Sequence, residues 1–191
     1  MSAAPPGVDS GRFRRVMGLF ATGVTVVAAE HGGEMHGMTA NAVTSVSLDP
    51  LLILVCVGRQ ARMSRFLEQS DGFAVNILAQ DQEALSRYFA GAWPQAAPPE
   101  FCFVPWEGGP RLVGALAALG CRRERMIDAG DHWIVLGRVT ALHEGDARSQ
   151  PLLFYGGRYR RLSDLEAIPA PDLWTDAAAQ IYYDEWSQGE R

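Results

Sequence analysis

The chain has 191 residues, of which 48% are hydrophobic and 20% charged, and its formal net charge is −5 at pH 7. This length and composition fit one globular domain. The acidic balance argues against nucleic acid or a membrane as the main partner. The longest apolar run, Leu51 to Val57, is far too short to span a bilayer.

The N-terminal part predicts a helix followed by a strand. Asp9 or Ser10 can cap a helix whose apolar residues recur at helical spacing, and Gly23 is expected to end it. Residues 24–29 read as a strand, and the pair Gly32-Gly33 gives the backbone freedom for a hairpin turn. The segment after this turn is therefore expected to pair antiparallel with the strand.

The run from Gly37 to Pro50 is the most informative segment and is expected to be one strand. Its side chains are small and polar, with hydroxyls and amides at Thr39, Asn41, Thr44, Ser45 and Ser47. A strand that only fills a core prefers bulky branched residues. Two interpretations stay open: a flat or polar ligand approaches the backbone here, or the run is a half-exposed edge strand.

The rest of the chain alternates short helices with strands that favour hairpins. The strand 51–57 is expected to be buried on both faces. The further expected elements are a helix at 60–69, a strand at 73–78, a helix capped by Asp81, a loop at 91–110, strands at 116–127 and 132–143 joined by a tight turn, and a strand at 152–155. Six or seven strands and three or four helices predict a mainly β, antiparallel barrel, closed or nearly closed, with peripheral helices.

Domain boundaries follow from composition. We expect a flexible N-terminus at 1–11, one domain at 12–165 and a tail at 166–191 that could be helical. No GxGxxG follows a strand, so a Rossmann nucleotide site is not predicted. The three cysteines, Cys56, Cys102 and Cys121, lack metal-ligand spacing and are interpreted as small buried hydrophobic residues in a reducing cytoplasm.

Hydrolytic and metal chemistry find little support. There is no GxSxG elbow, and the four histidines lack HxxxH or HExxH spacing, so we expect no metal site. His132 is the exception, because the turn Gly130-Asp131-His132 is expected to place it at the mouth of the barrel. There it could bond a carboxamide or a reduced-ring anion, or it could be a hairpin histidine without a role.

Three arginines, Arg59, Arg62 and Arg65, follow the apolar strand and open the next helix. Guanidinium groups match phosphate oxygens in a forked geometry, so these residues could form a phosphate clamp. The alternative is simple surface charge.

Taken together, these residues resemble the short-chain flavin reductase family, the reductase components of two-component flavin-dependent monooxygenases. The matching segments span Phe13 to Tyr159 and are residues 20–27, 37–42, 44–51, 73–78, 130–132 and 151–155. The resemblance implies an FMN-binding split β-barrel, a homodimer, and hydride transfer from NADH or NADPH to FMN or FAD. It also implies that reduced flavin passes to a separate monooxygenase. Direct hydride transfer between stacked rings needs positioning more than an acid or a base.

The resemblance also assigns residues to the ligands. The cofactor-binding set is Met38, Thr39, Ala40, Asn41, Ala42, Ser45, Val46, Ser47, Cys56, Val57, Arg59 and Arg62. The nicotinamide set is His132, Tyr155 and Arg158, with His132 also the catalytic candidate. Ala42, Ala61 and Met63 replace hydroxyl residues of the usual pattern, which shifts the expected phosphate contact to Arg59 and Arg62.

Two alternatives to a reductase remain. One is a non-enzymatic flavin-binding carrier or sensor on the same barrel, and the other is a barrel that holds heme or another planar cofactor. His132 separates the first alternative from the reductase, because only a nicotinamide site needs a histidine over the open face of the ring.

Overall fold

The computed structural model describes residues 8–146 and 148–162. The helices are α1 (Ser10–Met17), α2 (Arg62–Gln69) and α3 (Glu83–Phe89). The strands are β1 (Thr22–Gly23), β2 (Thr25–His31), β3 (Glu34–Ala40), β4 (Val43–Leu48), β5 (Leu51–Gly58), β6 (Gly72–Ile77), β7 (Phe103–Val104), β8 (Arg111–Leu112), β9 (Ala117–Ala129), β10 (His132–Glu144), β11 (Leu153–Tyr155) and β12 (Arg158–Arg160). No helix in this part of the chain is long and apolar enough to cross a membrane.

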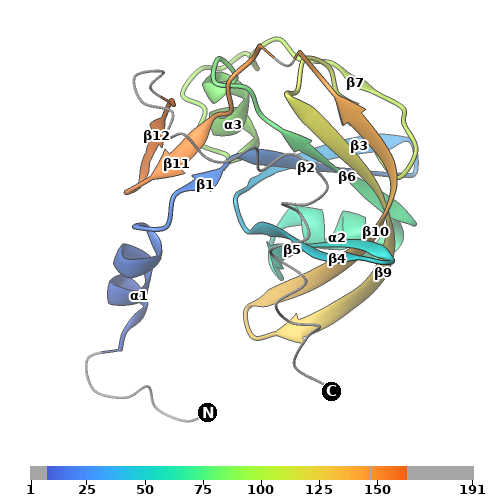
Figure 1. Ribbon diagram of the computed structural model, residues 1–191, viewed down its shortest axis with the longest axis horizontal. Helices are drawn as coiled ribbons and strands as arrows, with labels where there is room; N and C mark the ends of the chain where they lie inside the picture. Colours follow the sequence, from blue (N-terminus) through green and yellow to red (C-terminus); the bar gives the residue numbers. More distant parts are fainter. Residues whose placement is uncertain (1–7, 147, 163–191) are drawn as a thin grey trace, which may run out of the picture.

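One antiparallel sheet of seven strands forms the body, in the order β3-β2-β6-β9-β10-β5-β4 (Figure 1). The mainly β, antiparallel fold class is therefore confirmed. A smaller sheet, β1-β11-β12, lies to one side and leads to α1. The two long strands β9 and β10 and the tight turn between them follow the prediction closely.

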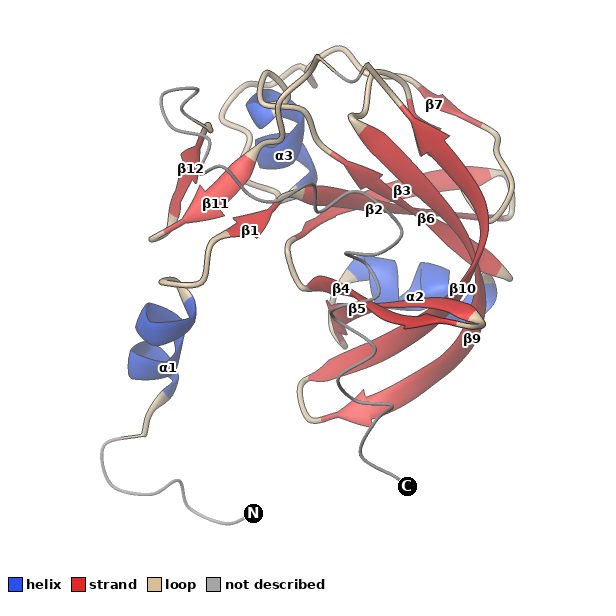
Figure 2. Ribbon diagram, viewed as in Figure 1, coloured by secondary structure: helices blue, strands red, loops and turns tan. Residues whose placement is uncertain are grey.

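The sheet curls so that its two edge strands are consecutive in sequence (Figure 2). β3 pairs only with β2 and β4 only with β5 among the described strands, and residues Asn41 and Ala42 join the two edges. The prediction of one strand from Gly37 to Pro50 is therefore wrong. The chain leaves one ladder at Ala40 and enters the other at Val43, which splits the barrel at this link.

The main core fills the inside of the curled sheet and is sealed by α2. Met63 and Leu67 of this helix are fully buried and Phe66 is nearly so, as its helical spacing predicts. In β5 the side chains of Ile53, Val55 and Val57 join this core. The residues between them are only half-buried, so the prediction that this strand is buried on both faces is wrong.

A second apolar cluster lies between β2, β6 and α3, where Val26, Leu78 and Leu85 are buried. α3 begins at Glu83 after Gln82, so the expected cap by Asp81 is wrong. The fully buried Asn76 ties this region together, because its amide nitrogen donates to the carbonyls of Val26 and Pro110 at 3.1 and 3.3 Å. Its side-chain oxygen accepts from the backbone N–H of Leu112 at 2.8 Å.

α1 confirms the predicted N-terminal helix and its cap. The side chain of Asp9 accepts from the backbone N–H of Arg12 at 2.9 Å. The helix ends at Met17, well before Gly23, because the chain then extends into β1. The expected tail at 166–191 lies outside the described residues.

The cysteines differ from the prediction in one case. Cys121 is buried and Cys56 half-buried, but Cys102 is exposed, so its assignment as a buried hydrophobic residue is wrong. It lies beside the short strand β7, where the loop runs over the surface.

Candidate functional site

Hydrogen bonds to residues of three other strands hold the link between the two sheet edges in place. The hydroxyl of Thr25 donates to the carbonyl of Ala40 at 2.7 Å, and the N–H of Cys56 donates to the carbonyl of Ala42 at 3.0 Å. The side chain of Asn41 donates to Thr22 Oγ1 at 3.2 Å. Asn41 and Ala42 are themselves exposed, so the link is held rigidly and still faces outward.

β3 is an edge strand, and this leaves part of its backbone without a ladder partner. The side chains of Met38 and Ala40 pack against or within the main core, and the hydroxyl of Thr39 donates to the carbonyl of Ser86 at 2.7 Å. On this strand the backbone is therefore more accessible to a ligand than the side chains of Met38, Thr39 and Ala40. Free N–H and C=O groups on an edge can bond a flat heterocycle.

His132 lies on the neighbouring part of the sheet, at the start of β10. It pairs with Gly58 of β5, and its Nε2 is 3.8 Å from where a Cβ on Gly58 would be. A hydrogen bond of 2.7 Å joins its Nδ1 to Asp131 Oδ1. This bond lowers the pKa of Asp131, with a smaller contribution from the charge of Arg14 in α1. The imidazole is therefore oriented by Asp131 and stands over a glycine.

Cys56 shares this face of the sheet, because residues paired across strands or two apart in one strand lie on the same face. It is two residues before Gly58 and pairs with Ile134. Partial burial raises the pKa of its thiol, which favours the neutral form. Val57 points the other way and is fully buried opposite Trp133, so only its backbone could reach a ligand.

The three predicted residues of β4 are exposed or half-exposed at the other sheet edge. A bulge places Ser45 opposite Ile53 and Ser47 opposite Leu52, with Val46 as the extra residue. Ile53 points into the core and Leu52 does not, so the two serine hydroxyls leave the strand on different faces.

The two arginines proposed as phosphate contacts are each paired with a carboxylate. Arg59 forms an ion pair with Asp128, donates through Nε to the carbonyl of Gly130 at 2.8 Å, and lies 4.0 Å from the ring centroid of Trp133. Arg62 pairs with Glu34 at the start of β3. The two guanidinium groups thus contact different strands, Arg59 at the end of β9 and Arg62 at the start of β3. The phosphate clamp stays a prediction. Arg65 is exposed on α2.

Tyr155 and Arg158 pair with each other across the turn from β11 to β12. Both are exposed, and the turn between them is bonded to the end of α1 through Gly156 N and Gly18 O at 2.8 Å. They belong to the small sheet, and within the described part of the chain no hydrogen bond or ion pair joins either of them to His132. Their part in nicotinamide binding stays a prediction.

An aromatic pocket of about 440 Å³ lies beside β3, and the sequence did not predict it. Its lining includes Gly37, Tyr88, Phe89, Phe101 and Phe103, with His36 and Arg62 at the side of α2. A Cβ on Gly37 would lie 2.7 Å from the ring of Phe89, so glycine is needed for this packing. The volume and lining suit a planar ring. The aromatic residues that flank the loop at 91–100 were the signal in the sequence.

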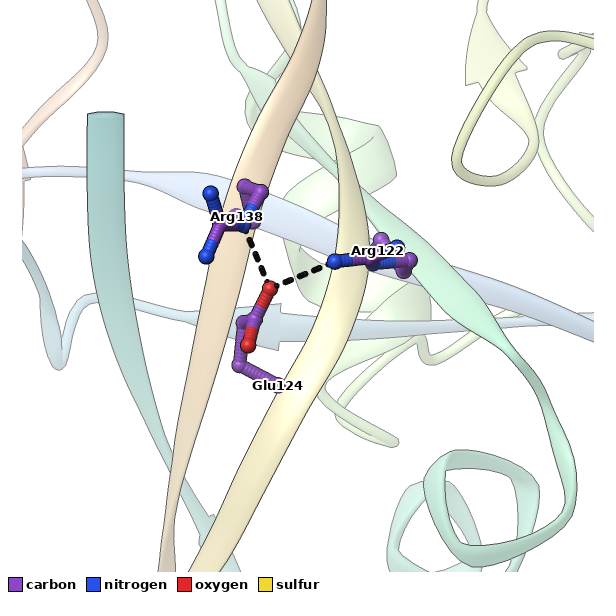
Figure 3. Close-up of polar contacts among 3 residues, drawn as sticks. All are labelled: Arg122, Glu124 and Arg138. Carbon is purple, nitrogen blue, oxygen red and sulfur yellow. Dashed lines mark hydrogen bonds and ion pairs between the residues drawn. The ribbon is translucent and has the colours of Figure 1, made fainter. Parts of the chain in front are cut away.

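Arg122, Glu124 and Arg138 form a charged cluster on β9 and β10 (Figure 3). Arg138 Nε and Arg122 Nη2 donate to the same carboxylate oxygen, at 2.5 and 2.9 Å, and these bonds lower the pKa of Glu124. The strand register shifts here between Leu136 and Gly137, and Glu124 is left out of the pairing. The cluster therefore neutralises a bulged carboxylate rather than forming part of the candidate site.

Comparison with known proteins identifies the family. The sequence model of the flavin reductase like domain matches residues 17–163. The chain belongs to this family. The NADH-dependent FAD reductase of Streptomyces globisporus is 43% identical over 160 residues, which cover 81% of this chain and 87% of that protein. The reductase subunit HsaB of a flavin-dependent monooxygenase from Rhodococcus jostii (strain RHA1) is 35% identical over 179 residues, covering 92% and 88%.

Solved structures of this family share the fold. The Streptomyces globisporus NADH:FAD oxidoreductase SgcE6, in complex with NAD and FAD fragments, superposes with a TM-score of 0.75 at 39% identity. The match covers 87% of this chain and all of that one. The family resemblance drawn from the motifs is therefore confirmed.

Proposed function

We propose that this protein is an NADH-dependent flavin reductase that supplies reduced FMN or FAD to a separate monooxygenase. The observation that carries the proposal is the exposed link at Asn41 and Ala42 between two sheet edges, with His132 on β10, which pairs with β5. Relatives that are 35 to 43% identical bear the names of FAD reductase and monooxygenase reductase subunit.

The residues present fit a flavin. The free edge of β3 and the link offer backbone N–H groups for the oxygen and nitrogen atoms of the ring. Gly58 and the small Cys56 leave room on the outer face for a flat molecule. A flavin bound by these residues would supply the acceptor for a hydride from NADH.

On this proposal, Met38 to Ala42 bind the ring through their backbone, and Ser45 or Ser47 bonds the ribityl chain. Arg62 is the stronger candidate for the phosphate, because it lines the aromatic pocket and its ion pair is with an exposed carboxylate, that of Glu34. Arg59 has a second role that its contacts support. It holds Asp128, the carbonyl of Gly130 and Trp133, and thereby positions the turn that carries His132.

His132 is proposed to bind the nicotinamide carboxamide through Nε2, since Asp131 occupies Nδ1. A donor ring held in the correct orientation removes most of the entropic barrier to hydride transfer. Tyr155 and Arg158 are proposed to border the same dinucleotide from the small sheet. We further propose that the protein is a homodimer of the cytoplasm, where its three free cysteines would stay reduced.

The test is NADH oxidation by the purified protein with FMN or FAD under air, followed by NADH absorbance. We expect turnover that requires added flavin, with reactions lacking flavin or protein as controls. Flavin binding without NADH oxidation, with either flavin, would instead support the carrier or sensor. Failure to bind flavin would contradict both.

A further inference from the structure

The aromatic pocket beside β3 lies at the free edge of that strand. Its lining includes His36, whose ring is 5.0 Å from that of Phe66 in α2. It also includes Gly37, which packs on Phe89 of α3. Successive residues of a strand face opposite sides, so a cavity that both residues line opens at the edge between the two faces. The same edge runs from Gly37 to Ala40, where the exposed link begins, over about 10 Å of extended strand.

The wall of the pocket is aromatic, yet its rings do not fill the space between them. The ring centroids of Tyr88, Phe89, Phe101 and Phe103 lie 5.0 to 5.7 Å apart in five contacts. The planes of these rings meet at 42 to 75°, so the rings are tilted or edge-on and do not stack face to face. A cavity of about 440 Å³ remains beside them. Ring faces that no neighbouring ring covers are surfaces on which a planar ligand can stack.

Three polar side chains border this cavity, those of His36, Arg62 and Tyr88. Within the described part of the chain, no hydrogen bond uses the imidazole of His36 or the hydroxyl of Tyr88. Burial, with a smaller contribution from the charge of Arg62, lowers the pKa of His36, so its imidazole is neutral at pH 7 and can both donate and accept. Arg62 is held by an exposed ion pair with Glu34, which contributes little and leaves the guanidinium available to another anion.

This combination of groups favours a nucleobase joined to a phosphate. The edge of a purine carries hydrogen-bond donors and acceptors, which match a neutral imidazole and a phenol, and the phosphate matches the guanidinium of Arg62. A simple aromatic acid would use Arg62 and leave the other two polar groups without a partner in the cavity. Among the flavins, FAD carries an adenosine phosphate end, whereas FMN stops at its own phosphate.

We propose that the aromatic pocket binds the adenosine phosphate end of FAD and makes this protein prefer FAD to FMN. The flavin ring then lies at the link, the phosphates follow the free edge of β3, and the adenine stacks on the aromatic wall. The position of the flavin ring rests on the proposed function, whereas the affinity of the pocket for adenosine phosphate does not.

The experiment measures the Kd of FAD, FMN, adenosine 5′-phosphate and benzoate by isothermal titration calorimetry, for the parent and three variants. Met35→Trp places a larger ring in the lining of the pocket. His36→Phe/Tyr88→Phe keeps a ring at both positions and removes the polar atoms. The control Leu142→Trp makes a similar change in β10, at a position that is 66% exposed and does not line the pocket. Circular dichroism checks that each variant is folded.

We expect the parent to bind FAD at least about tenfold more tightly than FMN, and adenosine 5′-phosphate at least about tenfold more tightly than benzoate. Met35→Trp should remove both preferences, because the added ring occupies the cavity. His36→Phe/Tyr88→Phe should weaken FAD and adenosine 5′-phosphate about fivefold or more, through the loss of two hydrogen bonds. The control should match the parent, and the Kd of FMN should stay within about twofold in every folded variant.

Three results would overturn the proposal: similar Kd values for FAD and FMN in the parent, no binding of adenosine 5′-phosphate, or an equal loss of both flavins in Met35→Trp. A raised KM for NADH in the flavin assay with unchanged flavin Kd values would also overturn it, and would assign the pocket to the adenosine of NADH. If neither flavin binds while Met35→Trp still abolishes the binding of adenosine 5′-phosphate, the proposed function fails and the pocket keeps its ligand class.

Discussion

Replacement of the buried Asn76 by Asp should destabilise the protein in a pH-dependent way. The change keeps an oxygen for the N–H of Leu112 and turns the amide nitrogen into a second oxygen. That oxygen would face the carbonyls of Val26 and Pro110, which now accept hydrogen bonds at 3.1 and 3.3 Å. The site is fully buried, so water cannot replace the lost donors.

The magnitude follows from the protonation of the new carboxyl. Burial without a cation raises the folded-state pKa above the unfolded value of about 3.9, by roughly 3 units or more. Each unit is worth about 1.4 kcal/mol, so at pH 7 the ionised form lowers the free energy of unfolding by about 4 kcal/mol. The folded state holds the proton more tightly, so stability falls as pH rises from about 4 toward the folded-state pKa. In a chain of this size that loss corresponds to a Tm lower by about 8–16 °C at pH 7.

Thermal unfolding of Asn76→Asp and of the parent between about pH 4 and pH 8, followed by circular dichroism, measures this difference. The control is Asn41→Asp at the other asparagine, which is exposed and should change the free energy of unfolding by about 0.5 kcal/mol or less. An Asn76→Asp protein as stable as the parent at pH 7, or a Tm difference that shrinks with rising pH, would refute the reasoning.

Three further outcomes are expected. His132→Ala should raise the KM for NADH or lower kcat in the flavin assay and leave the flavin Kd within about twofold; collapse of flavin binding would place His132 in the cofactor site. Gly137→Ala puts a Cβ 2.6 Å from Phe73 Cζ and 2.9 Å from Cys121 Cβ, so urea unfolding should show a loss of about 1–3 kcal/mol; an unchanged midpoint would contradict it. Burial raises the pKa of Cys121 to about 12, so near pH 8 a thiol reagent should label the exposed Cys102 in the folded protein and Cys121 only after unfolding; equal rates would contradict this.

The sequence predicted elements whose signals are local. The spacing of Met63, Phe66 and Leu67 identified α2 and its buried face, and the turn at Asp128 to Asp131 identified the hairpin of β9 and β10. The break at Asn41 and Ala42 was missed because neither residue is a glycine or a proline. The curling of the whole sheet, rather than a local breaker, ends β3 and begins β4 there.

The residues of the candidate site were proposed from the sequence, and they stay a prediction, whereas their arrangement in space came only from the structure. The pairing of His132 with Gly58 joins segments more than seventy residues apart, and spacing along the chain carries no trace of it. The aromatic pocket draws on β3, α3 and the segment around β7, so no single pattern contained it. Arg59 was predicted to bind a ligand phosphate, but its observed contacts are with Asp128 and Gly130 in the turn between β9 and β10.

The link at Asn41 and Ala42 sets a mechanical limit on the binding region. From Ala40 to Val43 the chain makes three Cα steps of about 3.8 Å, so these two positions can never separate by more than about 11 Å. The covalent chain therefore sets an upper limit to the gap between the strand ends, and heat or denaturant cannot raise this limit. Lengthening the link by one residue would raise this limit by a single Cα step of about 3.8 Å. The length of the link therefore limits how far the two strand ends can move apart when a ligand binds beside them.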